Sequence, residues 1–153
     1  MMLAGHLMKL KQFLLFNPPS TPPHRRTAGQ GLVEFALLLP ILALLLVGVF
    51  DLGRAFHVRI TLNNASREAA RFGTLDRTNL AGMRAAAIQE AQDSGIVIAS
   101  GDITLTCPDS GTAAPCARDT TLLVTITHQY DPVLSFFFPS GITIRGRTEM
   151  RIP

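Results

Sequence analysis

One carboxylate stands inside the longest apolar stretch of this chain. Leu32–Phe50 contains a single charged residue, Glu34, and a single proline, Pro40. If this stretch lies in a membrane, a carboxylate at its centre would cost about 2.5–3.5 kcal/mol on insertion scales, and less near the interface. An ionisable residue in such a place predicts a functional site in which Glu34 meets a positive partner. Gly29, five residues earlier, places a very small residue at the edge of the run.

The two cysteines, Cys107 and Cys116, form the second chemical feature. An even number at close spacing, in a segment that we expect to be exported, predicts one disulfide. Closing a loop of this length would stabilise the fold by about 2.5–3 kcal/mol on the chain-entropy model. The alternative is a pair of free thiols in a cytosolic domain. Two cysteines without a nearby histidine make an incomplete metal-ligand set, so we expect neither a metal nor a cofactor.

Catalysis and nucleic-acid binding find little support. Residues 51–153 contain no nucleophile–base set, metal cluster or phosphate-binding loop, so we expect no enzyme activity. The net charge of +3 comes from residues 1–29, which hold four basic residues and no acid. Residues 51–153 lack a basic stripe with interleaved aromatic residues, which argues against nucleic-acid binding.

The apolar run is long enough to cross a membrane. Its 19 residues span nearly 30 Å as a helix, about the thickness of one hydrocarbon core. The rest of the chain is too short to surround it. We expect Asp51 and Arg54 to mark the outer water boundary. A kink is expected at Pro40, which removes one backbone hydrogen bond and clashes with the Ala36 carbonyl.

The run has a basic, proline-rich segment before it and a helical pattern after it. Residues 1–29 look like a leader that is cleaved, and residues 30–73 like a membrane helix that continues into an amphipathic stem. The stem is predicted by a narrow apolar seam with alternating spacings of three and four: Ala55, Val58, Leu62, Ala65, Ala69 and Phe72. This seam packs either on the chain's own sheet or on a neighbouring subunit, and both are open.

Residues 74–153 are expected to form a small exported α+β domain. A break at 73–79 precedes a short helix, with Asn79 as its N-cap and Gly95 as its stop. The apolar period then changes to two, which predicts three strands, at 103–107, 122–129 and 142–152. The fold class is therefore a membrane-anchored α+β protein with a long N-terminal helix, a second short helix and a small antiparallel sheet. Phe136–Phe138, in the last loop, are either core residues or a docking patch for lipid or a partner.

The junction before the apolar run resembles a prepilin-like leader. Ala28-Gly29-Gln30-Gly31-Leu32-Val33-Glu34-Phe35 has the order glycine, four residues, glutamate and aromatic. The longer stretch 29–73 resembles the TadE-like family, which comprises pilin-like proteins of tight-adherence (Tad) pilus systems. The matching residues are Gln30 to Leu37, Leu39-Pro40, Gly48, Asp51, Gly53-Arg54 and Asn64 to Arg71, with a weaker similarity at Thr143 to Arg151.

This resemblance implies a function and its residues. Cleavage between Gly29 and Gln30 by an aspartic prepilin peptidase would create an α-amino group that pairs with Glu34 of a neighbour. The chain would be a minor pilin or pseudopilin that takes part in assembling a Tad-type pilus with other pilin-like subunits, since the major pilins of these systems are much shorter. The alternative is a single-pass, membrane-tethered binding or enzyme domain unrelated to pili.

The expected location is the cytoplasmic membrane, with possible incorporation into a surface pilus. Basic residues near the two ends of the apolar run are balanced, so charge alone does not orient it. The predicted disulfide and leader favour a cytoplasmic N-terminus and an extracytoplasmic C-terminal domain.

Overall fold

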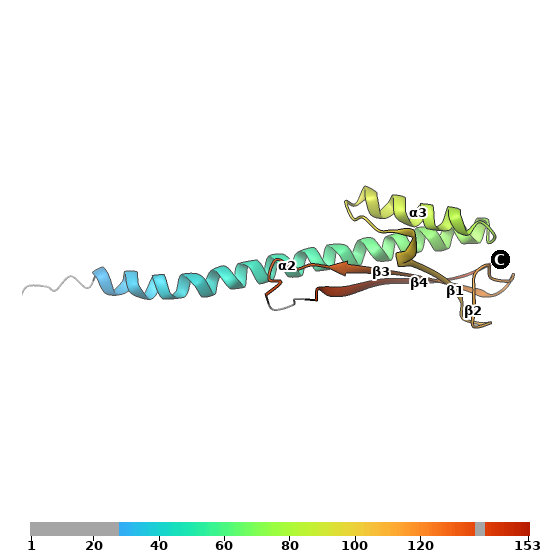
Figure 1. The fold of residues 1–153 in the computed structure, drawn as a ribbon. Coiled ribbons are helices and arrows are strands. Elements are labelled where there is room, and N and C mark those ends of the chain that lie inside the picture. Colours follow the sequence, from blue (N-terminus) through green and yellow to red (C-terminus); the bar gives the residue numbers. More distant parts are fainter. Residues whose placement is uncertain (1–27, 137–139) are drawn as a thin grey trace, which may run out of the picture. The chain divides into compact units, whose positions relative to one another are not determined.

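The structure, a computed structural model, describes residues 28–136 and 140–153 and has the expected α+β composition (Figure 1). The predicted leader up to Thr27, together with Phe137 and Phe138, lies outside the described residues. The elements follow the order α2 (Ala28–Leu75), α3 (Leu80–Asp93), a 3-10 turn η1 (Ser100–Asp102), β1 (Ile103–Cys107), β2 (Thr112–Ala113), β3 (Thr121–Tyr130) and β4 (Ile142–Arg151).

The described chain divides into two units. The first holds the part of α2 up to Leu38, and the second comprises Leu39–Pro153. Every side chain from Gly29 to Leu46 is exposed, including the large apolar ones. By length and composition, α2 can cross a membrane, with a mean hydropathy of 2.7 over its most apolar window.

The seam on the later part of α2 forms the core of the second unit. Val58, Leu62, Ala65 and Ala69 are buried, and Ala55 and Phe72 pack against the same core. Of the two alternatives for the seam, the structure supports packing on the chain's own domain. The small alanines bring the helix backbone close to its neighbours, and apolar burial at these positions stabilises the pairing of helix and sheet.

The break predicted at Gly73 was placed too early. α2 continues through Gly73 to Leu75. A Cβ atom built on Gly73 would lie 2.6 Å from Leu122 Cδ2 and 3.0 Å from Met83 Cε. A side chain here would have to displace the ends of the Leu122 and Met83 side chains, so glycine suits this close packing against β3 and α3. The helix ends two residues later, before the turn that leads to Asn79.

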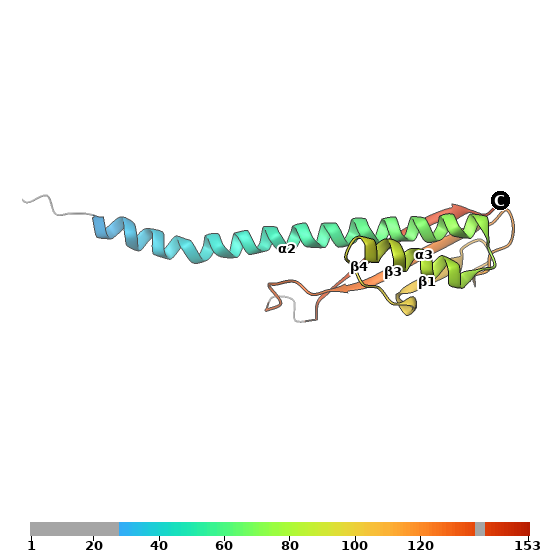
Figure 2. The same cartoon turned by 90° about the horizontal axis from the view of Figure 1, so that it is seen from above.

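The second helix follows its sequence signals. The Asn79 side chain caps α3 by accepting a hydrogen bond from the Gly82 N–H at 2.8 Å. Met83, Ala87 and Ala91 are buried at intervals of four residues. Beyond the helix, Gly95 has φ +77°, a left-handed conformation that glycine adopts readily. Figure 1 and Figure 2 both show α3 beside the part of α2 that ends at Leu75.

The sheet is antiparallel with the order β2-β1-β3-β4. The three predicted strands are present, and the buried residues of β1 and β3 alternate as expected from their period of two. β2 was not predicted, because two residues are too short to show any period. β4 is an edge strand, and its charged side chains Arg145, Arg147 and Arg151 discourage pairing with other strands.

The edge strand is held closely against α2. A Cβ atom on Gly146 would overlap the backbone carbonyl of Leu62, so only glycine permits this approach. Beside this contact, the Arg147 N–H donates to Asn63 Oδ1 at 3.3 Å. Buried Ser66 shares a hydrogen bond of 2.7 Å between its Oγ and Thr148 Oγ1. The register of β4 along the helix is therefore fixed by one steric and two polar contacts.

Candidate functional site

The sequence-predicted residues at the N-terminal junction lie in the first turns of α2. Gly29, Gln30 and Glu34 are helical and exposed. Glu34 forms no ion pair with any described residue. Pro40 is inside the same continuous helix, where it leaves the Ala36 carbonyl without its usual donor. The expected kink remains a prediction.

The glycine at the predicted cleavage point has no packing role among the described residues. A Cβ atom added at Gly29 would meet no atom within 4 Å. Gly146 differs, because a Cβ atom there would overlap the backbone of Leu62. No contact among the described residues therefore requires a glycine at position 29.

A second site lies where the apolar run ends, and it is centred on Asp51. This carboxylate is only 8% exposed. Its Oδ1 accepts a hydrogen bond from the Val133 N–H at 2.9 Å, and its Oδ2 accepts one from the Leu134 N–H at 3.0 Å. The Tyr130 hydroxyl donates to the Asp51 carbonyl oxygen at 3.1 Å and lies 3.3 Å from Oδ1. Asp51 thus joins α2 to the end of β3 and to the loop that follows.

The electrostatics of this junction favour an ionised aspartate. The backbone N–H groups of Leu134 and Val133 lower the pKa of Asp51, with smaller contributions from Tyr130 and from the charge of Arg54. Burial, together with the nearby Asp51 carboxylate, raises the pKa of Tyr130. Arg54 lies over the Tyr130 ring, 5.5 Å from its centroid. The sequence led us to expect only a water boundary at Asp51 and Arg54. The structure shows in addition that Asp51 is bonded to Tyr130, Val133 and Leu134, and we call these contacts the Asp51 anchor.

The hydrogen bonds of Asp51 place the loop after β3 at the end of the apolar run. Val133 is 56% and Phe136 is 89% exposed. For Phe136 the docking-patch alternative therefore agrees with the structure better than a core position does. Because Asp51 directly follows Phe50, the two backbone hydrogen bonds hold this loop beside the first turn of α2 beyond the apolar run.

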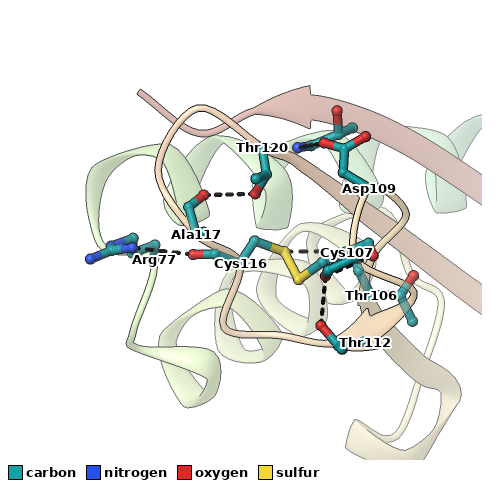
Figure 3. The surroundings of a disulfide bond; sticks show 10 residues. Arg77, Thr106, Cys107, Asp109, Thr112, Cys116, Ala117 and Thr120 are labelled. Carbon is teal, nitrogen blue, oxygen red and sulfur yellow. Dashed lines mark hydrogen bonds between the residues drawn. A yellow bond between two sulfur atoms is a disulfide. The ribbon is translucent and has the colours of Figure 1, made fainter.

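The predicted disulfide is present between Cys107 and Cys116, with Cα atoms 5.5 Å apart (Figure 3). It closes the segment that contains β2. The same segment is tied to its surroundings by Arg77, which donates to the Cys116 carbonyl at 3.4 Å, and by Asp109, which accepts from the Thr121 N–H at 2.6 Å. The bond therefore reinforces the region between β1 and β3. It does not contribute to the Asp51 anchor.

The described residues contain no group of three or more His, Cys, Asp or Glu side chains that could hold a metal ion. Sequence reasoning did not identify the role of Tyr130. The signal was available, because one more step of the alternation Leu122, Val124, Ile126 and His128 places Tyr130 on the buried face of β3.

Comparison with known proteins supports the resemblance seen in the sequence. Residues 29–71 match the family model described as TadE-like protein. The matched stretch includes the junction at Gly29, the apolar run, Asp51 and most of the buried seam. Comparisons with curated proteins and with solved structures return no match. The similarity to the TadE-like family is therefore confined to residues 29–71 of α2, and the sheet has no counterpart in these comparisons.

Proposed function

We propose that this chain is a minor pilin or pseudopilin that takes part in assembly of a Tad-type surface pilus. In this proposal, α2 anchors the subunit in the cytoplasmic membrane before assembly. The observation that supports it most directly is the exposed apolar surface from Gly29 to Leu46, which carries Glu34 and falls within the TadE-like match. The chain's own domain leaves this surface uncovered, so it is available to lipid first and to neighbouring subunits later.

Cleavage between Gly29 and Gln30 is the first step of the proposed mechanism. The open space around Gly29 supports recognition by a peptidase, since nothing in the described structure requires a glycine there. Hydrolysis of this peptide bond leaves a carboxylate on Gly29 and a new α-amino group on Gln30. A prepilin peptidase of the same membrane is the proposed enzyme.

Charge pairing is the second step. Glu34 has no ionic partner among the described residues, and the segment around it is apolar. In a bundle of such helices, the α-amino group of one subunit can neutralise the Glu34 carboxylate of its neighbour. Attraction between unit charges strengthens as the local dielectric falls, so the pair is more favourable within a helix bundle than in water. Removal of one partner would leave an uncompensated charge.

The proposed orientation places the N-terminus in the cytoplasm and the α3–β4 region outside. The disulfide between Cys107 and Cys116 supports it, because such bonds persist in oxidising compartments.

N-terminal sequencing of the membrane-bound protein from its host tests the cleavage step. The mature chain should begin at Gln30, and a Gly29→Leu variant should remain uncut. Gly53→Leu is the matched control, because a Cβ atom at Gly53 also meets nothing within 4 Å. If the mature wild-type chain starts elsewhere, or if Gly29→Leu is processed normally, the proposed cleavage site is wrong.

Piliation of a Glu34→Ala strain tests the charge pair. The variant should insert into the membrane at normal levels but give few pili, and Glu34→Gln should behave alike because it also lacks the charge. A strain with Glu68→Ala, on the same helix but beyond the apolar run, should form pili normally. Normal piliation of the Glu34→Ala strain would contradict the pairing. Normal piliation after deletion of the whole gene would instead favour the tethered-domain alternative.

A further inference from the structure

An open apolar groove lies between α2 and the edge strand β4. Its volume is about 530 Å³, within the range of roughly 300–1,000 Å³ that is usual for small-molecule sites. Each element supplies four lining residues, which are Leu52, Ala55, Phe56 and Arg59 from α2, and Ile142, Thr143, Ile144 and Arg145 from β4. The lining is apolar over most of its length and ends in two arginines.

The other end of the groove reaches the apolar run Leu32–Phe50. A smaller hollow of about 250 Å³ shares Leu52, Ala55 and Ile142 with the groove and extends to Gly48. Gly48 lies within Leu32–Phe50, the segment that we assign to the bilayer. An apolar path therefore leads from the membrane segment, past the Asp51 anchor, to the two arginines.

The charges along this path favour an anionic ligand. Arg59 and Arg145 are exposed, and neither forms an ion pair with a described residue. The acidic residue on the path, Asp51, lines only the smaller hollow, and both of its carboxylate oxygens already accept hydrogen bonds. Both arginines line the same groove, so an anionic group bound there would find positive charge without a competing acid.

The distance of Arg59 from the end of the apolar run suits a lipid headgroup. Arg59 follows Phe50 by nine residues, a rise of about 13 Å along the helix. Helical side chains tilt toward the N-terminus, here toward the membrane, and long arginine side chains extend to the headgroup layer. This layer occupies roughly 5–7 Å beyond the hydrocarbon on each side. The Arg59 guanidinium can thus reach a phosphate that remains at the surface of the bilayer.

We propose that this groove binds one anionic phospholipid of the surrounding membrane. The acyl chain lies along Leu52 and Ile142, and the phosphate lies between Arg59 and Arg145. Such a lipid would hold the small domain upright at the membrane surface. The proposal requires α2 to span a membrane but does not depend on pilus assembly, so either proposal can fail without the other.

Native mass spectrometry of the full chain in nanodiscs tests this site. The probes are phosphatidylglycerol and phosphatidylcholine in equal amounts, and the measured quantity is the ratio of the two lipids retained by the protein. Wild type should retain one phosphatidylglycerol in preference to phosphatidylcholine. Arg59→Gln with Arg145→Gln should lower the ratio at least about tenfold, because each basic residue near a membrane surface contributes to attraction of anionic lipid. Arg59→Lys with Arg145→Lys should keep most of the preference.

The matched control is Arg67→Gln with Arg118→Gln, which removes the same charge from exposed positions outside the groove. Its lipid ratio should equal that of wild type. An equal fall in this control would show diffuse charge attraction and overturn the site. Absence of a headgroup preference in wild type would also overturn it, as would a lipid-free dimer, which would assign the groove to a second copy of the chain.

Discussion

Replacement of Gly146 by alanine gives a direct test of how α2 and β4 fit together. The added Cβ would overlap the carbonyl carbon and oxygen of Leu62 and would lie 2.7 Å from Leu62 Cβ. Neither backbone can yield easily. Leu62 is fully buried in the middle of α2, and Gly146 is paired with Ile126 inside the sheet. Overpacking of this kind costs about 1–3 kcal/mol, and the backbone overlap places this case near the upper value.

Thermal unfolding of the full chain in detergent micelles, followed by near-ultraviolet circular dichroism, measures the effect. With a shift of about 4 °C per kcal/mol for a domain of this size, Gly146→Ala should lower Tm by about 8–12 °C. Gly101→Ala is the matched control, since its Cβ would meet nothing within 4 Å, and its Tm should stay within about 2 °C of wild type. Equal melting of the two variants would refute the close contact between β4 and α2.

Two further predictions concern the disulfide and the Asp51 anchor. Cys107→Ser with Cys116→Ser should lower the free energy of unfolding in urea by about 2.5–3 kcal/mol, and a reductant should do the same to wild type but not to the variant. Because hydrogen bonds lower the pKa of Asp51 below its ordinary 3.8, its stabilisation is complete above that value and is lost as the pH falls through the lowered pKa. The Tm difference between wild type and Asp51→Asn should therefore be constant near neutral pH and shrink in acid below 3.8; a difference independent of pH would contradict the ionised anchor.

The sequence predicted the main elements because local signals and tertiary packing agree in them. The seam from Ala55 to Phe72, the cap at Asn79 and the alternation in β1 and β3 each report one buried face. The error at Gly73 has a physical cause. Glycine can mark either a helix end or a close approach of another element, and only the position of Leu122 decides between them. No local pattern contains that information.

The candidate sites likewise divide into residues that the sequence alone singles out and residues that depend on the tertiary structure. Gly29 and Glu34 were singled out from the sequence alone, by the spacing between them and by the charge of Glu34 within an apolar run, and their roles stay predictions. The Asp51 anchor was not singled out, because its partners come from β3 and the following loop, 79 to 83 residues away. The groove between Arg59 and Arg145 also depends on the register of β4 along α2, which Gly146, Asn63 and Thr148 set.

The two parts of α2 differ in what their apolar residues do. From Val58 to Ala70 the buried face is used by the chain's own sheet and by α3, so this face is not available for contact between subunits. From Gly29 to Leu46 the apolar side chains are exposed on all sides, and the described domain supplies no cover for them. Asp51 stands between these parts and holds the domain to the helix where the apolar run ends. A chain that used this helix only as a tether would need nothing more than the apolar residues themselves. This chain adds a carboxylate near the start of the apolar run and, at its end, an aspartate that holds the loop after β3 to α2; both features go beyond what a tether requires, and they agree with the assembly role that we propose.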